Sequence, residues 1–303
     1  MSVPRLFGCV EAGGSKFVVA ICNHRGEILA EDRFPTADPG STLAATKAFL
    51  RRQGETLGAL TAIGVASFGP VELDRTSVRY GSMGKTPKPG WSGIDIVGAL
   101  ARELSCPMGF DTDVNATALA EHRWGAARDV NDLVYLTVGT GIGGGVLVGG
   151  APVHGLMHPE IGHVYPRRHP RDLEFAGVCP FHGDCLEGVA SGPAIFARTG
   201  ATLGQLDESH PQWEIEADYL GQLCAQLVAA VSPQRIIMGG GVMNQLRLLP
   251  LIRLRMRHWL GGYINRSEIL DGADNYVVAP GLGDRAGVLG ALVLAMNAAA
   301  SAL

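Results

Sequence analysis

A glycine-rich segment in the middle of the chain, residues 134–150, is the feature that most restricts the fold. Apolar and β-branched residues flank its glycines, which predicts a strand, a turn and a second strand. Glycine adopts backbone angles that other residues resist, so several N–H groups of such a turn can converge on one ligand. A converging set of N–H groups binds phosphate. The alternative is a tight hairpin in which the glycines serve only the bend.

The same pattern of strand, glycine turn and strand occurs near the N-terminus. Aligning Gly13 with Gly141 also aligns Val18 with Val146. A weaker similarity relates residues 63–70 to residues 236–242, because each is an apolar strand that runs into glycine. Two similarities in the same order predict a duplicated α/β fold. Chance similarity between glycine turns is the other interpretation.

The composition of the chain limits its partners and its compartment. A length of 303 residues is enough for two packed units, and 47% hydrophobic with 18% charged residues is typical of a globular protein. A net charge of −4 and a pI near 6.1 argue against a general nucleic-acid or membrane-surface role and favour a small soluble ligand. No signal sequence or membrane-spanning run is recognised, and the six cysteines are scattered, so we expect a cytoplasmic protein without a disulfide framework.

Two regions outside the glycine turns have simple interpretations. Residues 81–91 have turn chemistry and predict a surface loop, although an exposed Trp91 with Lys85 and Lys88 nearby would instead line a polar ligand site. Residues 246–259 predict an amphipathic helix whose arginines form a solvated face rather than a partner site. These arginines are Arg247, Arg253, Arg255 and Arg257.

Polar residues 111–115 lie between an apolar strand and a helix, just before the central glycine turn. Phosphoryl transfer to an alcohol needs a group that orients the hydroxyl and accepts its proton, and a carboxylate at this place can do so. Helix capping alone is the alternative, because Asp and Asn are common caps. One helix cap needs fewer polar side chains than are present here. We therefore favour a functional role for at least one of Asp111, Asp113 and Asn115.

A cluster of cysteine and histidine follows in a loop-rich region. Cys179, His182 and Cys185 stand at i, i+3 and i+6, and tetrahedral zinc takes four such ligands. This spacing favours a structural zinc site, with no position open for water, over two unlinked thiols. His163 is a candidate fourth ligand, as are His154, His158 and His169.

Two glutamates flank this cluster, Glu160 before it and Glu187 after it. Carboxylates on a loop held by a metal can accept hydrogen bonds from several hydroxyl groups, as sugar recognition requires. The alternative interpretation is that both are solvated surface side chains.

Taken together, these segments resemble the ROK family of bacterial sugar kinases, most closely its fructokinase branch. The resemblance extends over nearly the whole chain, with the motifs in the family's order. They are residues 11–16 and 139–145 as the two phosphate loops, residues 111–115 as the catalytic segment, residues 160–163, and the Cys/His cluster that runs into residues 187–192. Glu11, residues 86–91 and the form of the metal loop most resemble fructokinases.

The resemblance implies two RNase H-like α/β domains of the actin-like, hexokinase-type ATPase fold. An interdomain cleft is expected to hold ATP and to close on the sugar. The first domain is expected at residues 1–115, joined by the C-terminal helix 286–303. The second is expected at residues 116–285 and contains the zinc loop.

The resemblance also implies roles for individual residues. Asp113 is expected to be the general base. Glu160, His163 and Glu187 are expected to contact the sugar, and His163 also to bind zinc through its other ring nitrogen, beside Cys179, His182 and Cys185. Magnesium is expected to accompany ATP. The ATP phosphates are expected at Gly13, Gly14, Ser15, Lys16, Thr140 and Gly141, and the adenosine at Gly239, Gly240, Gly241, Gly281 and Gly283.

The expected reaction is transfer of the γ-phosphate of MgATP to the 6-hydroxyl of D-fructose. Thr112 stands where many family members have Asn, which removes an amide that often meets the sugar and argues against glucose specificity. Mannose, glucose or an N-acetylated amino sugar are alternative acceptors, and a non-catalytic sugar sensor or an actin-like assembly protein is the alternative class. The default assembly is a homodimer, with sugar and ATP as ligands and no nucleic-acid or membrane partner.

Overall fold

The computed structural model describes residues 5–302, and two five-stranded sheets form the centres of two compact units. The first unit contains the chain up to Ala120, the segment Pro152–His158 and the chain from Leu282 onward. The second contains Glu121–Ala151 and Pro159–Gly281. Residues 1–4 and 303, which belong to the predicted domain ranges, lie outside the described residues. No helix among the described residues is long and apolar enough to span a membrane.

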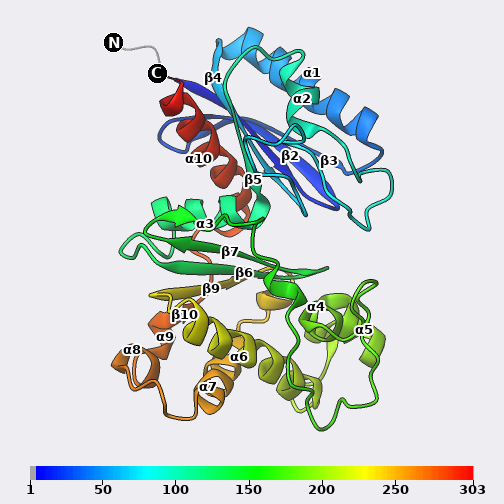
Figure 1. Cartoon of the computed structure of the whole chain (residues 1–303), viewed down its shortest axis with the longest axis vertical. Helices are drawn as coiled ribbons and strands as arrows, with labels where there is room; N and C mark the ends of the chain where they lie inside the picture. Colours follow the sequence, from blue (N-terminus) through cyan, green and yellow to red (C-terminus); the bar gives the residue numbers. More distant parts are fainter. Residues whose placement is uncertain (1–4, 303) are drawn as a thin grey trace. The chain divides into compact units, whose positions relative to one another are not determined.

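The first sheet has the strand order β3-β2-β1-β4-β5 (Figure 1). The first three strands form an antiparallel meander, whereas β4 runs parallel to β1, and β5 parallel to β4. Most residues of β1 and β2 are buried, because helices cover both faces of the sheet. The strands are β1 (Leu6–Ala12), β2 (Lys16–Asn23), β3 (Ile28–Pro35), β4 (Leu60–Ser67) and β5 (Met108–Thr112).

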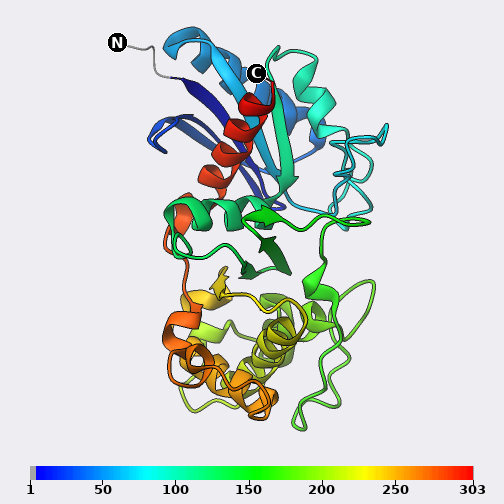
Figure 2. The ribbon, with the colours of Figure 1, turned by 60° about the vertical axis from the view of Figure 1, so that its left-hand side comes forward.

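Helix α10 (Ala286–Ser301) packs on one face of this sheet, and α1 (Pro39–Leu57) covers the other face (Figures 1 and 2). A Cβ atom at Gly64 of β4 would lie 1.8 Å from the backbone oxygen of Ala291 in α10. Glycine at this position therefore lets the helix backbone approach the sheet closely. This unit also contains α2 (Ile96–Ala101) and the beginning of α3 (Asp113–Trp124).

Trp91 is buried in the core of the first unit, so the interpretation of Trp91 as an exposed ligand-site residue is wrong. Its exposed fraction is 0%, and its ring centroid lies 5.4 Å from that of Phe17 and 5.6 Å from that of Phe68. The indole Nε1 donates a hydrogen bond to the backbone oxygen of Ala37 at 2.9 Å. The surrounding turn is polar, but burial of one large aromatic side chain with its N–H group satisfied is favourable.

The second sheet has the strand order β10-β9-β6-β7-β8. Read from β8 to β10, this order is the third, second, first, fourth and fifth strand of the sheet along the chain. The first sheet, read from β3 to β5, has the same order. The duplication predicted from the glycine turns is therefore confirmed at the level of topology. The strands are β6 (Leu133–Val138), β7 (Ile142–Val148), β8 (Ala151–Pro152), β9 (Arg235–Gly239) and β10 (Val277–Val278).

Helices α6 (Gln212–Ala230) and α7 (Leu248–Leu260) pack against each other in the second unit (Figure 1). Helix α7 confirms the helix predicted at residues 246–259. The prediction of a solvated arginine face is wrong for Arg253 and Arg255, whose guanidinium groups lie 2.6 Å from Asp274 and 2.6 Å from Glu214. The other helices of the second unit are α4 (Leu186–Ala190), α5 (Gly192–Thr199), α8 (Ser267–Leu270) and α9 (Ala273–Tyr276).

Candidate active site

The predicted catalytic segment lies where β5 ends and α3 begins. Thr112 Oγ1 accepts a hydrogen bond from the backbone N–H of Asn115 at 3.1 Å, so Thr112 caps the helix. One carboxylate oxygen of Asp113 accepts from the N–H of Val114 at 2.9 Å, and Asp113 is only partly buried. Because Thr112 provides the cap, capping alone does not account for Asp113 at the first position of the helix.

Asp111 and Asn115 stabilise this turn from the inside. The Asp111 carboxylate is buried and accepts hydrogen bonds from the N–H of Thr112 at 2.7 Å and from Nδ2 of Asn115 at 2.8 Å. Its second oxygen lies 3.0 Å from Nε2 of His154, which belongs to the Pro152–His158 segment. The hydrogen bond to Asp111 raises the pKa of His154. Sequence reasoning considered His154 only as a zinc ligand and missed this contact.

The first glycine turn joins β1 to β2. The N–H of Gly13 donates to the backbone oxygen of Lys16 at 3.0 Å, and Thr36 binds the backbone oxygens of Gly13 and Ser15. A Cβ atom at Gly13 would lie 2.7 Å from the oxygen of Lys16, whereas a Cβ at Gly14 would meet nothing within 4 Å. The turn therefore requires glycine at position 13 for its own geometry and leaves open space at Gly14.

Glu11 lies beneath the start of α10. A Cβ atom at Gly287, in the first turn of that helix, would lie 2.2 Å from the Glu11 carboxyl carbon. The partial positive charge at the beginning of a helix favours a carboxylate at such a place. Burial nevertheless raises the pKa of Glu11, and the charges of Lys16 and Arg33 oppose that shift.

The second glycine turn joins β6 to β7, and Glu187 is bound to it. A carboxylate oxygen of Glu187 accepts from the N–H of Ile142 at 3.0 Å and would lie 2.6 Å from a Cβ atom at Gly141. Thr140 stands between Gly139 and Gly141, and the N–H of Gly139 donates to the oxygen of Gly141 at 2.9 Å. The sugar-contact residue expected from the sequence is thus attached to the expected phosphate loop.

Glu160 lies close enough to Glu187 for the two carboxylates to interact. Removal from water, with a smaller contribution from the Glu187 charge, raises the pKa of Glu160 to about 7. Like charges near one another disfavour the second ionisation, which is typical of functional carboxylate pairs.

The glycines expected near adenosine have two different surroundings. Gly240 has a φ angle of 93° and a Cβ there would lie 2.5 Å from the backbone oxygen of Val138, so other residues would be strained. The N–H of Gly281 donates to a carboxylate oxygen of Glu121 at 3.0 Å, which also accepts from Ala126 at 2.7 Å. Sequence reasoning missed Glu121, although a glutamate on a largely apolar helix was a signal for it. The remaining members of this set are Gly239, Gly241 and Gly283.

The Cys/His cluster forms in the second unit, with His163 as its fourth member. The possible ligand atoms of His163, Cys179, His182 and Cys185 all lie within 4.8 Å of one another. Nδ1 of His163 lies 3.5 Å from the Cys185 sulfur, and Nδ1 of His182 lies 3.6 Å from the Cys179 sulfur. Zinc bonds of ~2.0–2.3 Å in a tetrahedron place neighbouring ligand atoms at roughly these separations. His163 itself ends the short 3₁₀ helix η1 (Ile161–His163).

The other candidate histidines have different partners. His154 is paired with Asp111, Nε2 of His158 accepts from the N–H of Val71 at 3.1 Å, and Nδ1 of His169 accepts from the N–H of Arg171 at 3.2 Å. The structure therefore groups His163, and not these three, with the two cysteines and His182.

Comparison with known proteins shows the family of this chain. The model of the ROK family matches residues 7–298. The chain belongs to the ROK family. This ROK protein is 43% identical over 297 residues to a fructokinase from Zymomonas mobilis subsp. mobilis, with 97% of both chains covered. It is 39% identical over 293 residues to a fructokinase from Pediococcus pentosaceus, with 97% of this chain and 98% of that protein covered.

A solved ROK structure has the same fold. The crystal structure of a ROK hexokinase from Thermus thermophilus superimposes with a TM-score of 0.77 at 26% identity, over 96% of this ROK chain and 98% of that one. The predicted actin-like ATPase fold, with two α/β units, is therefore confirmed.

Proposed function

We propose that this protein is an ATP-dependent fructokinase that transfers the γ-phosphate of MgATP to the 6-hydroxyl of D-fructose. The observation that best supports the proposal is Asp113 at the first position of α3, where Thr112 provides the cap and Asp111 and Asn115 stabilise the turn. High identity to two fructokinases over nearly the whole chain favours fructose as the acceptor.

Asp113 acts as the general base in this proposal. A carboxylate that accepts the proton of the attacking hydroxyl makes the oxygen a better nucleophile as its bond to phosphorus forms. The hydrogen bond from the N–H of Val114 restricts the orientation of the Asp113 carboxylate, which reduces the entropy lost when the sugar binds. Asp113 is therefore a catalytic residue, and Asp111 and Asn115 are positioning residues.

The two glycine turns bind the ATP phosphates through the backbone N–H groups that are not used within the turns, because the N–H groups of Gly13 and Gly139 already donate to Lys16 and Gly141. Gly13, Gly14, Ser15 and Lys16 form one set, and Thr140 and Gly141 form the other. Magnesium neutralises phosphate charge when the nucleotide is bound. Gly239, Gly240, Gly241, Gly281 and Gly283 flank the adenosine.

Glu160, His163 and Glu187 contact the sugar. Because the pKa of Glu160 is about 7, the protonated and the ionised forms are both populated near neutral pH, and the ionised form accepts hydrogen bonds from sugar hydroxyls. His163 directs Nδ1 toward the cysteines, which leaves Nε2 for the sugar.

His163, one of these three residues, also belongs to the Cys/His cluster, which would hold a zinc ion next to Glu187 in α4. Two thiolates and two imidazoles fill a tetrahedral site, so His163, Cys179, His182 and Cys185 would bind zinc as a structural ion. Binding fixes the positions of His163 and of Cys185, the residue at the start of the helix that contains Glu187.

Further parts of the proposal concern assembly and location. We propose a homodimer, since twofold symmetry is the commonest oligomeric arrangement. Sedimentation velocity measures the oligomeric state and tests this part of the proposal. We also propose a cytoplasmic location, in keeping with a small soluble sugar and ATP as ligands.

The test is ADP release by the purified protein with MgATP and fructose, mannose, glucose or N-acetylmannosamine. Asp113→Asn is measured alongside, with Asp271→Asn as the control because Asp271 is an exposed carboxylate outside the proposed site. We expect the highest turnover with fructose, loss of turnover only in Asp113→Asn, and retained nucleotide binding in that variant. Higher turnover with another sugar would favour a different hexose or amino-sugar kinase, and no turnover with any sugar would favour a non-catalytic sensor.

A further inference from the structure

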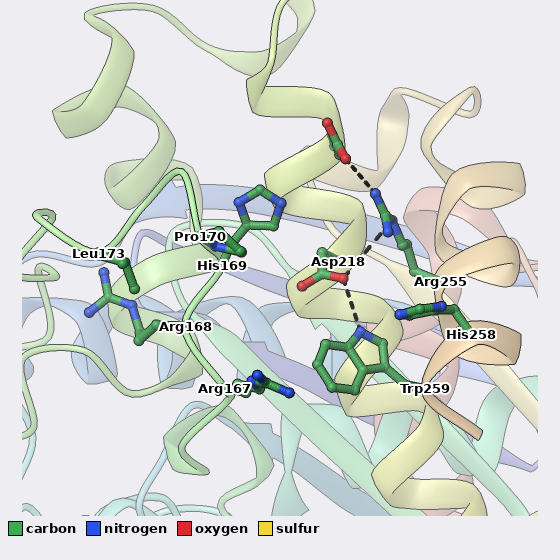
Figure 3. Close-up of a pocket in the computed structure, with 10 residues that line it drawn as sticks. Arg167, Arg168, His169, Pro170, Leu173, Asp218, Arg255, His258 and Trp259 are labelled. Atoms are coloured by element: carbon green, nitrogen blue, oxygen red, sulfur yellow. Dashed lines mark hydrogen bonds and ion pairs between the residues drawn. The ribbon is translucent and has the colours of Figure 1, made fainter. Parts of the chain in front are cut away.

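A large pocket lies in the second unit, and none of the residues that line it is among the proposed catalytic, ATP, sugar or zinc residues. Its volume is about 680 Å³, and its walls come from the loop at residues 167–173 and from helices α6 and α7 (Figure 3). Ligand pockets for small molecules have roughly 300–1,000 Å³. The cavity is therefore large enough for a ligand of monosaccharide size or above.

The acidic groups of the pocket already have partners. Asp218 is buried and accepts hydrogen bonds from Nε1 of Trp259 at 2.9 Å and from Nε2 of Gln222 at 3.0 Å. Glu214 pairs with Arg255 at 2.6 Å and with Arg171 at 3.2 Å. Arg255 also lies 3.9 Å from the Asp218 carboxylate (Figure 3). Neither acid is available to attract a cation.

The polar side chains that remain in the pocket are Arg167, His169 and His258. Within the described residues, Arg167 forms no ion pair, and its guanidinium lies 6.0 Å from the Trp259 ring centroid. Nδ1 of His169 accepts from a backbone N–H at 3.2 Å, so the proton of its neutral ring is on Nε2. His258 packs edge-on against Trp259 with the ring centroids 5.7 Å apart. Because the two acids of the pocket are already paired, its arginine and two imidazoles favour a ligand that is negatively charged and rich in hydrogen-bond acceptors.

The pocket also has an apolar side. Pro170 and Leu173 line it together with the face of Trp259, and Leu173 remains 63% exposed. Such a surface suits the carbon skeleton of a ligand, while the cationic group suits a terminal oxyanion.

One arginine connects the pocket to the zinc loop. The guanidinium of Arg168 lies 3.0 Å from Asp184, which stands between the cluster residues His182 and Cys185. The same group donates to the backbone oxygen of Phe175 at 2.6 Å.

We propose that this pocket binds an organic phosphate monoester, with its phosphate at Arg167 and its carbon skeleton against Leu173 and Trp259. The planar guanidinium can contact two phosphate oxygens at once. No residue that lines the pocket belongs to the proposed ATP and sugar set, and the proposal does not depend on the proposed fructokinase activity.

Isothermal titration calorimetry on the full chain tests the proposal with three probes: inorganic phosphate, glucose 1-phosphate and AMP. The titrations are made with fructose and a non-hydrolysable ATP analogue present at saturation, so that the proposed active site is filled. We expect glucose 1-phosphate or AMP to bind more tightly than inorganic phosphate. Tighter binding of glucose 1-phosphate would indicate a sugar phosphate as the ligand, and tighter binding of AMP would indicate a nucleotide.

Arg167→Gln should weaken binding about tenfold or more, because a charge-assisted contact to phosphate is lost. Arg257→Gln is the matched control. Arg257 is on α7 but does not line the pocket, and its guanidinium binds the backbone oxygen of Leu270. Both variants remove one positive charge near the protein surface, and circular dichroism checks that each is folded. No binding of any probe, or equal weakening in both variants, would overturn the proposal, and neither result depends on catalytic turnover.

Discussion

Nε2 of His154 lies 3.0 Å from Oδ2 of Asp111, a carboxylate that is 3% exposed at the end of β5. His154 belongs to Pro152–His158, which groups with the first unit although the chain on both sides belongs to the second. The pair therefore attaches this short segment to the turn from which Asp113 projects. His158 makes a second attachment through the N–H of Val71 at 3.1 Å.

Replacing His154 should destabilise the first unit. In His154→Ala the buried Asp111 oxygen loses its partner, and we expect a loss of about 1 kcal/mol, since water can reach part of the half-exposed site. Chemical denaturation measures the change. The control is His122→Ala, because His122 makes one exposed contact with Asn131 at 3.2 Å. Equal losses in the two variants would contradict a special role for the Asp111 contact.

The contribution of His154 should depend on pH. Its pKa is raised by the hydrogen bond to Asp111, so the stabilisation is fully present below the ordinary histidine pKa and is lost as the pH rises through the raised value. The difference in stability between the wild type and His154→Ala should be larger near pH ~6 than near pH ~9. A difference in stability between the two proteins that grows toward alkaline pH would contradict this prediction.

Fructose affinity should follow the ionisation of Glu160. Its pKa of about 7 means that the carboxylate, the form that accepts hydrogen bonds from hydroxyls, becomes dominant above neutrality. The KM for fructose should therefore fall between pH ~6 and ~8, and this fall should disappear in Glu160→Gln. Glu174→Gln serves as the control, since Glu174 is exposed on the same loop region. If the KM of Glu160→Gln for fructose depended on pH as in the wild type, Glu160 would have no role in sugar binding.

Loss of the Cys/His cluster should lower thermal stability. Cys179→Ser should remove stoichiometric zinc, and a loss of about 3 kcal/mol would lower the Tm by roughly 6–12 °C. A chelator should lower the Tm of the wild type and leave that of the variant unchanged. Cys106→Ser is the control, because Cys106 lies outside the cluster. Full zinc content in Cys179→Ser would disprove the proposed ligand set.

The first glycine turn offers two adjacent positions with opposite expectations. Gly13→Ala places a Cβ 2.7 Å from the Lys16 oxygen and should cost about 1–3 kcal/mol of stability. Gly14→Ala meets nothing within 4 Å and should change stability by less than about 0.5 kcal/mol. Thermal melts without nucleotide compare the two. Similar melting temperatures would mean that the turn tolerates a side chain at Gly13.

Several particular features were accessible from the sequence. The strands on each side of Gly13 and Gly141 and the start of α3 near Asp113 are determined by patterns within a few residues of one another. Local apolar alternation, turn residues and helix caps depend on neighbours along the chain, so they can be recognised without knowledge of distant contacts. The spacing of Cys179, His182 and Cys185 can likewise be recognised from neighbours along the chain.

The tertiary structure decided what depends on distant residues. It buried Trp91 against Phe17, paired His154 with Asp111, and selected His163 among the candidate histidines. It also paired Arg255 with Glu214 on another helix, where the helical pattern alone predicted a solvated face. The sequence by itself determined the local elements around the glycine turns and the catalytic segment, and the types of chemical group. Only the fold decided which groups meet, because burial and pairing depend on residues brought together from separate parts of the chain.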